Sequence, residues 1–258
     1  GRVILTPDDA ALSPLHLPVA VTPSSGVFPD LVEINTRRNA GSQMIEDLMS
    51  IEVTDLTVES FGLVRADLTE VPLGVIDNYP DFPDIYYANL DDAYAAWIPV
   101  PAGAKRLVAE VTDTTSPDLD MLVAYDANGN DVMDLEDTAL HDYCQSAASG
   151  PWEYCDITSP DAGDWYVIVI NFEAAVSGTP DPLTLATAVV PDADAGNMTF
   201  EGPTSVGLLE PFDLRLFWDT PTMVAGDCWY GSFSLGSAPG SEGDIGTIPV
   251  NVIRHADD

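Results

Sequence analysis

The chain has 258 residues, of which 46% are hydrophobic, and this length can form one large domain or two to three small ones. Its 43 acidic and 8 basic residues give a formal net charge of −35 at pH 7. A field of this sign repels nucleic-acid phosphates and anionic lipid, so we expect no nucleic-acid partner. The charge fits either solvation in salt or at an extracellular surface, or dedicated calcium sites. No apolar stretch approaches the roughly 18 residues of a membrane span, so we expect none.

The chain begins without an initiator methionine or an export signal, and we interpret it as a mature or excised fragment. Its first apolar segments, residues 2–6 and 16–22, predict two strands. Residues 31–38 and 51–61 alternate between apolar and polar side chains, as strands with one buried face do. Residues 43–50 between them are ambiguous and also fit a helical turn.

The most regular pattern lies between residues 96 and 172, where three apolar-alternating segments are separated by turn residues. Period-two spacing gives the first two segments one apolar face each, formed by Leu107, Ala109 and Val111, and by Leu119, Met121, Val123 and Tyr125. Asn128-Gly129 predicts a tight hairpin from the second segment to Val132, because this pair accepts positive φ angles. The apolar run of residues 165–170 suits the middle of a sandwich.

The two ends of this central region are marked by turn residues. Residues 77–92 combine turn signals with aromatic side chains, and we place the start of a central domain there and its end near Pro191. The last segment predicts about four strands, at residues 198–206, 212–218, 229–236 and 245–254. Four strands are few for an independent sandwich. We therefore expect residues 28–76 to pack with residues 193–256, and the predicted fold class is all-β and antiparallel.

These segments carry a family resemblance. The central region resembles the bacterial pre-peptidase C-terminal domain, which accompanies secreted peptidases, in PAGAKRLVAEV, PDLDMLVAYDANGN and PDAGDWYVIVINF. Fibronectin type III-like segments that follow subtilisin-type catalytic domains are similar to HLPVAVTP near the start and to EGPTSV, PFDLRLFWD, WYGSFSLGS and IGTIPVNVIRH near the end. The motifs cover nearly the whole chain and are specific as a set, while each one alone is weak. The resemblance implies a jelly-roll-like central β-sandwich beside a fibronectin type III or immunoglobulin-like sandwich.

The resemblance and the strand pattern together divide the chain into four parts. Residues 1–27 are the terminal strands of a fibronectin-like domain, and residues 28–76 are the first part of a discontinuous fibronectin-like sandwich. Residues 77–192 form the pre-peptidase C-terminal-like sandwich. Residues 193–258 complete the discontinuous one.

The three cysteines indicate in which cellular compartment the protein is found. Cys144 and Cys155 bracket a short segment, and we predict a disulfide between them, with two free buried thiols as the alternative. Closing so short a loop stabilises a fold by about 3 kcal/mol on the chain-entropy model. A disulfide implies an oxidising, extracellular location. Cys228 is left over, either as a buried thiol or as a link between molecules.

Calcium is the metal that the acidic residues favour. Asp118 and Asp120 stand at alternate positions of a predicted strand, so both carboxylates face the same way, and Asp113 is near in sequence. We predict a Ca²⁺ site from these three residues at the rim of a sandwich. Asp91 and Asp92 are comparable candidates.

A second acidic segment resembles a calcium loop in spacing only. The matching positions are Asp126, Asn128, Asn130 and Asp137. Asp131 stands where such a loop needs its turn-forming glycine, and we expect strands on both sides of it. A hairpin turn explains Asn128-Gly129 without a metal.

Catalytic motifs are missing from the sequence. His16, His141 and His255 stand in unrelated contexts, and neither a nucleophile elbow nor the contexts of a subtilisin-type triad occur. We therefore predict that this chain is not itself an enzyme. A subtilisin-type catalytic domain would precede it in a longer protein.

Aromatic residues form the remaining candidate surface. They gather in the segment before the central strands and beside the cysteines, as Tyr79, Phe82, Tyr86, Tyr87, Tyr94, Trp97, Trp152 and Tyr154. Exposed, they would bind a polymer, and buried, they would pack between domains, which we favour.

The sequence predicts a non-catalytic accessory region of a secreted subtilisin-like peptidase. Its expected partners are the linked catalytic domain and a protein polymer or cell-surface material. The alternative is an extracellular structural or adhesive subunit that associates with itself by strand addition, because strands 2–6 and 16–22 would belong to an incomplete sandwich.

Overall fold

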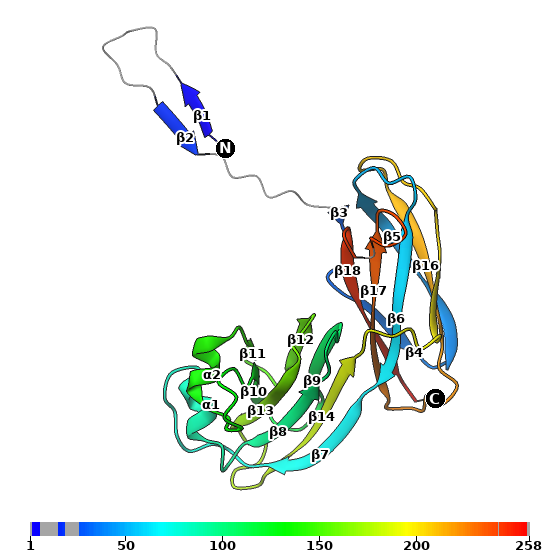
Figure 1. Cartoon of the computed structure of the whole chain (residues 1–258). Helices are drawn as coiled ribbons and strands as arrows, with labels where there is room; N and C mark the ends of the chain where they lie inside the picture. The colour runs from blue at the N-terminus through cyan, green and yellow to red at the C-terminus, as the bar shows by residue number, and fades with distance from the viewer. Residues whose placement is uncertain (1, 6–14, 19–25, 242, 257–258) are drawn as a thin grey trace.

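The computed structural model describes residues 2–5, 15–18, 26–241 and 243–256. The fold is all-β, as predicted, and contains four four-stranded sheets in which the strands are mostly antiparallel (Figure 1). The sheets form two pairs, each around its own hydrophobic core. Among the described residues no helix is long and apolar enough to cross a membrane.

The terminal sheet pair is built from strands at both ends of the chain. One sheet has the order β15 (Met198–Glu201), β16 (Phe212–Asp219), β5 (Ala40–Ser50) and β3 (Gly26–Val27). The other has the order β4 (Val32–Thr36), β18 (Gly246–Arg254), β17 (Cys228–Gly236) and β6 (Thr57–Arg65), with β4 parallel to β18. In β16 the alternate residues Phe212, Leu214, Leu216 and Trp218 are buried, which is the period of two expected for a strand with one face on a core.

The central sheet pair is built from the middle of the chain. One sheet has the order β11 (Cys144–Ser146), β10 (Asp118–Tyr125), β13 (Gly163–Glu173) and β8 (Tyr94–Val100). The facing sheet has the order β12 (Tyr154–Thr158), β9 (Arg106–Thr114), β14 (Asp181–Val190) and β7 (Asp67–Leu73). The two predicted apolar faces, of β9 and β10, meet in one core.

Strand β13 is buried on both of its faces. Trp165, Val167 and Val169 point toward the core shared with the sheet of β12, β9, β14 and β7. Tyr166 and Ile168 point to the other side of their own sheet, where they lie in a second cluster. That outer cluster includes residues of α1 (Asp84–Ala88), and Tyr166 donates a hydrogen bond to Asp137 in α2 (Leu135–Leu140). The near-continuous apolar run of residues 165–170 therefore reflects a strand in the interior of the molecule.

Two local predictions are wrong. The predicted strand 51–61 begins only at Thr57, after a loop, while residues 43–50, which the sequence left ambiguous, are strand and belong to β5. The tight hairpin at Asn128-Gly129 does not form, because the chain continues through α2 before β11 pairs with β10. A capping box at Asp134, with Asp137 at its third helical position, begins this helix.

The first strands form a sheet of their own. β1 (Arg2–Leu5) pairs antiparallel with β2 (Leu15–Pro18). The prediction of strands at residues 2–6 and 16–22 is confirmed for the described part, while residues 6 and 19–22 lie outside the described residues.

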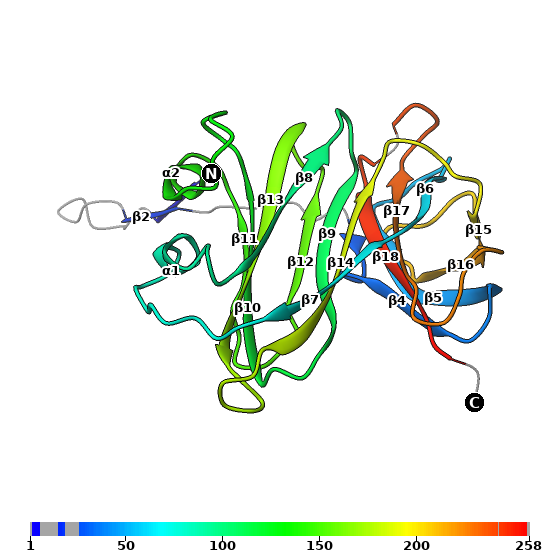
Figure 2. The ribbon, with the colours of Figure 1, turned by 90° about the horizontal axis from the view of Figure 1, so that it is seen from below.

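The two sheet pairs lie against each other along β14, β9, β17 and β6 (Figure 2). Between them is a buried cluster formed by Phe61, Ala66, Val108, Ala186, Ala188, Val190, Cys228 and Tyr230. Strand β7 ends at Leu73, before the predicted boundary at residue 76, and pairs with β14 in the central pair. The division of the chain into four parts that belong to separate domains stays a prediction.

Candidate functional site

Arg106 connects the two sheet pairs. Its side chain is 1% exposed although it carries a charge, and it forms a bidentate pair with Asp156, at 2.8 Å from Nε to Oδ1 and 2.9 Å from Nη2 to Oδ2. Nη1 donates across the junction to the carbonyls of Gly231 and Val250, at 2.8 and 3.0 Å. Nη2 also donates to Asn251 Oδ1 at 2.7 Å. Arg106 therefore joins the two sheet pairs by hydrogen bonds across their junction.

A cleft opens at this junction. Its volume is about 460 Å³, within the range of roughly 300 to 1,000 Å³ typical of binding pockets. The central pair contributes Glu110, Val111, Thr112, Trp152, Glu153 and Tyr154, and the terminal pair contributes Leu31, Glu33, Cys228, Asn251, Ile253 and His255. The cleft therefore exists only because the two pairs are packed together.

The cleft combines acidic side chains with an exposed ring. Burial is the main cause that raises the pKa of Glu110, and Glu33 raises it further, while the Tyr230 hydroxyl donates a hydrogen bond to it. Trp152 at the edge of the cleft is 64% exposed. Negative charge beside an aromatic surface suits a ligand that is cationic and partly apolar.

The other aromatic candidates divide between packing and exposure. Tyr86 is fully buried and donates a hydrogen bond to the Met121 carbonyl at 3.2 Å. Tyr79 and Phe82 are exposed and contact Phe172, and Trp97 is exposed and contacts Tyr166 edge-on. These residues do not line the cleft, whereas the aromatic candidates Trp152 and Tyr154 do, and of these two Trp152 is the exposed one.

The three predicted calcium ligands do not lie together on one sheet. Asp118 and Asp120 are neighbours on β10, whereas Asp113 is exposed on β9 in the facing sheet. Burial raises the pKa of Asp120 to about 7, and the next causes are the charges of Glu153 and Asp118. The charge that acts most strongly on Asp120 is therefore that of Glu153, a residue outside the predicted set.

Sequence reasoning missed Glu153, because its position follows no periodic pattern. It stands two residues before Cys155, and the predicted disulfide could have indicated that it returns toward β11 and β10. Burial is the main cause that raises the pKa of Glu153, and Asp118 raises it further, while the Ser146 hydroxyl lowers it.

The remaining acidic candidates lie elsewhere. Asp91 and Asp92 are exposed on the segment between α1 and β8. In the loop after β10, Asp126 accepts hydrogen bonds from the backbone of Gly129 and Asn130, and Asp137 accepts one from Ala127. Asp131, which stands where a calcium loop needs a glycine, has a φ of 58°, and the segment after it forms α2 instead of the expected strand.

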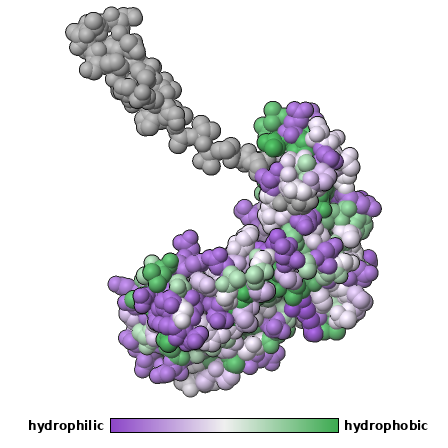
Figure 3. Space-filling view, viewed as in Figure 1, coloured by the Kyte–Doolittle hydropathy of each residue, from purple (hydrophilic) through white to green (hydrophobic). Residues whose placement is uncertain are grey.

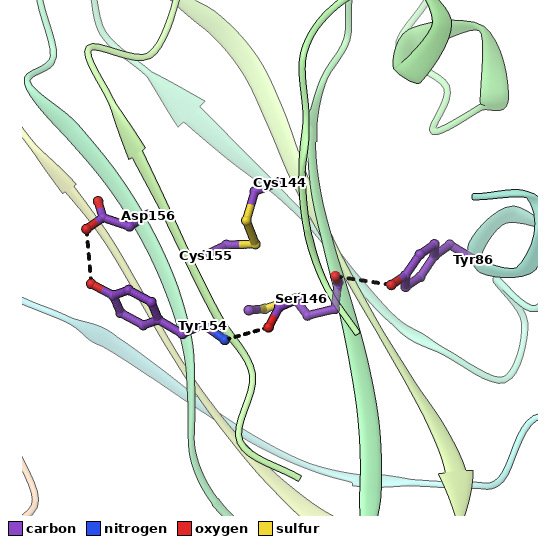
Figure 4. The surroundings of a disulfide bond; sticks show 7 residues. Tyr86, Cys144, Ser146, Tyr154, Cys155 and Asp156 are labelled. Carbon is purple, nitrogen blue, oxygen red and sulfur yellow. Dashed lines mark hydrogen bonds between the residues drawn. A yellow bond between two sulfur atoms is a disulfide. The ribbon is translucent and has the colours of Figure 1, made fainter. Parts of the chain in front are cut away.

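The predicted disulfide between Cys144 and Cys155 is confirmed, with 5.8 Å between the Cα atoms. It joins β11 to β12, which are edge strands of the two facing sheets of the central pair (Figure 4). Next to it, the Tyr154 amide donates to Ser146 Oγ at 3.2 Å. The third cysteine, Cys228, is a free thiol that is buried in the junction.

The side chains of two histidines have defined contacts. His141 Nε2 lies 3.0 Å from Asp161 Oδ2, and its ring contacts Tyr125 and Trp165. His255 Nε2 lies 2.6 Å from the Asn35 side-chain oxygen. The side chain of His16 lies outside the described residues.

No protein-family model matches this chain, and no curated protein matches it either.

Proposed function

We propose that the chain is a non-catalytic accessory region of an extracellular subtilisin-like peptidase, which stabilises the enzyme and engages a protein polymer. In this proposal the central pair is a jelly-roll-like sandwich of the pre-peptidase C-terminal type, and the terminal pair is a fibronectin type III or immunoglobulin-like sandwich. The second assignment is supported by the two four-stranded sheets of the terminal pair, which face each other around one core. The disulfide supports an oxidising compartment.

The observation that carries the binding proposal is the cleft at the junction. Binding sites occur preferentially where two packed units meet, and this cleft is lined by both sheet pairs. Glu33 and Glu110 give it negative charge, and Trp152 gives it an exposed apolar surface. An extended polypeptide with alternating basic and apolar side chains would satisfy both.

Replacing Trp152 with alanine should weaken polypeptide binding about fivefold or more, because exposed aromatic anchors dominate such interfaces. The probe is a fluorescent unstructured peptide that alternates lysine with leucine, titrated by anisotropy in enough salt to screen the general acidic field. A version with glutamate in place of lysine tests the charge preference.

Trp97→Ala is the matched control, since Trp97 is exposed on β8 outside the cleft. It should bind the lysine peptide like the unchanged protein. Equal loss in both tryptophan variants, or no loss in either, would contradict a binding site at the junction.

A second candidate, self-association by strand addition, is favoured by a different observation. Strand β5 pairs with β16 on one side along most of its length, but on its other side β3 covers only Met49 and Ser50. Residues 40–48 therefore present an unpaired strand edge within the described part of the chain. Such edges are templates for a strand from another molecule.

The matching donor would be the β1–β2 hairpin of a second copy. Both strands pair only with each other among the described residues, and isolated two-stranded hairpins are marginal in water. We expect sedimentation velocity to show assembly that grows with concentration and disappears when residues 1–25 are removed. A protein that stays monomeric across the concentration range would exclude this candidate.

A further inference from the structure

Two rows of side chains face each other across the cleft at the junction. In the terminal pair, Glu33 of β4, Asn251 of β18 and Tyr230 of β17 are direct partners in the strand register. Register partners project from the same face of a sheet, with about 4.8 Å between neighbouring strands. In the central pair, Tyr154 of β12 is the register partner of Glu110 of β9. The junction thus brings a row of three side chains opposite a row of two.

Hydrogen bonds show how the two rows meet. The Tyr230 hydroxyl donates to the Glu110 carboxylate, and the Asn251 amide donates to the Tyr154 hydroxyl at 3.2 Å. Tyr230 therefore lies opposite Glu110 and Asn251 opposite Tyr154, which makes Glu33 the next side chain in line, beyond Asn251. Glu110 is half-buried, whereas Glu33 is exposed, and both line the cleft. The cleft therefore carries one carboxylate in its interior and one nearer its mouth.

Both carboxylates are held in position by neighbouring side chains. Asn35 Nδ2 donates to Glu33 Oε1 at 2.6 Å, and Asn35 Oδ1 lies 2.6 Å from His255 Nε2. Glu110 accepts the Tyr230 hydrogen bond through Oε2. These bonds use one oxygen of each carboxylate and leave the other for a ligand.

Neither carboxylate has a cation of its own. Among the described residues, the ion pairs of Lys, Arg and His side chains include neither Glu33 nor Glu110. Arg106 acts on Glu110, but its guanidinium already forms the bidentate pair with Asp156. A half-buried carboxylate without a paired cation is costly, and a cationic ligand would offset this cost.

We propose that the cleft binds one basic side chain of the polypeptide, a lysine or an arginine, whose cationic group lies between Glu33 and Glu110. This inference rests on the proposed function and adds which residues select the ligand. The cationic group would donate charge-assisted hydrogen bonds to both carboxylates, and such bonds are stronger than neutral ones. Trp152, which borders the same cleft, would contact the alkyl part of the side chain and contribute affinity without regard to charge.

The test uses a short soluble peptide with a single lysine beside a leucine in a glycine–serine background, and the same peptide with Nε-acetyl-lysine. Both are titrated into the ¹⁵N-labelled full chain by NMR. We expect the unchanged protein to prefer the lysine peptide about tenfold, because hydrogen bonds to charged groups are the stronger ones. Glu33→Gln and Glu110→Gln should each lower this preference about threefold or more, and the double variant should remove it. Binding of the acetylated peptide should stay the same in all of them.

Glu201→Gln is the matched control. It removes the same charge from the protein, but Glu201 is exposed on β15 and does not line the cleft. The preference for lysine should therefore be unchanged in this variant. An equal loss of preference in Glu201→Gln would overturn the inference, since the general acidic field would then be its cause.

The remaining outcomes separate this inference from the proposed function. If Trp152→Ala weakens both peptides while the double variant still prefers lysine, selection by Glu33 and Glu110 is overturned and the cleft remains the binding site. If neither peptide binds the unchanged protein, the proposed binding function fails and this inference fails with it. Near-UV circular dichroism checks that Glu110→Gln is folded, and Glu33→Gln, at an exposed position, decides the question if it is not.

Discussion

Replacing Arg106 with alanine should lower the free energy of unfolding by about 3 to 5 kcal/mol, the usual cost of breaking a buried ion pair. The substitution leaves Asp156 without its cation, and it leaves the carbonyls of Gly231 and Val250 without their shared donor. Arg106→Lys should lose a large part of the same amount, because an ammonium cannot reproduce the fork of hydrogen bonds. Urea denaturation followed by tryptophan fluorescence measures the loss.

The matched control is Arg215→Ala. Arg215 is an exposed arginine on β16 and should change the stability by no more than about 0.5 kcal/mol, as surface substitutions do. A separate consequence concerns cooperativity, because Arg106 donates hydrogen bonds from the central sheet pair to the terminal one. We expect the unfolding of Arg106→Ala to separate into two transitions. A loss below 1 kcal/mol would show that the apolar cluster alone holds the junction.

Removing the disulfide by replacing both Cys144 and Cys155 with alanine should lower the free energy of unfolding by about 3 kcal/mol. The two cysteines are 11 positions apart, so the bond closes a short loop in the unfolded chain. In the folded chain the bond also joins the edges of the two central sheets. Guanidinium denaturation under oxidising conditions gives the difference.

Reduction provides the control for this prediction. Dithiothreitol should lower the stability of the unchanged protein to that of the double variant and leave the variant itself unaffected. The buried thiol of Cys228 is present in both proteins and cancels in the comparison. Equal stability of the two proteins before reduction would show that the bond contributes little beyond the packing around it.

The strands of the central pair were predictable because their signal is local. Leu107, Ala109 and Val111 repeat with a period of two, and in the structure they face the matching residues of β10. The apolar run of residues 165–170 identified a strand that is buried on both faces. Period-two patterning reports burial directly, so these elements did not depend on knowing their partners.

Local signals failed where a short element was decided by its surroundings. Helix α2 has only six residues, too few for a helical period, and it depends on the cap at Asp134 and on contacts of Asp137 with Tyr166. Asn128-Gly129 was therefore interpreted as a hairpin, although the chain there leads into a helix. Residues 43–50 were ambiguous for the same reason. They form a strand because they pair with β16, which is far away in the chain.

By itself the sequence determined the all-β class, the main strands of the central pair, the Cys144–Cys155 disulfide and an acidic surface, on which hydrophilic residues are widespread over the face in Figure 3. Only the tertiary structure decided that Glu153 raises the pKa of Asp120 while Asp113 is exposed on the facing sheet, and that Arg106 is buried against the other sheet pair. The physical reason is that spacing along a strand sets which face a side chain occupies, whereas its neighbours on that face come from distant strands whose order and register depend on the packing of the whole chain.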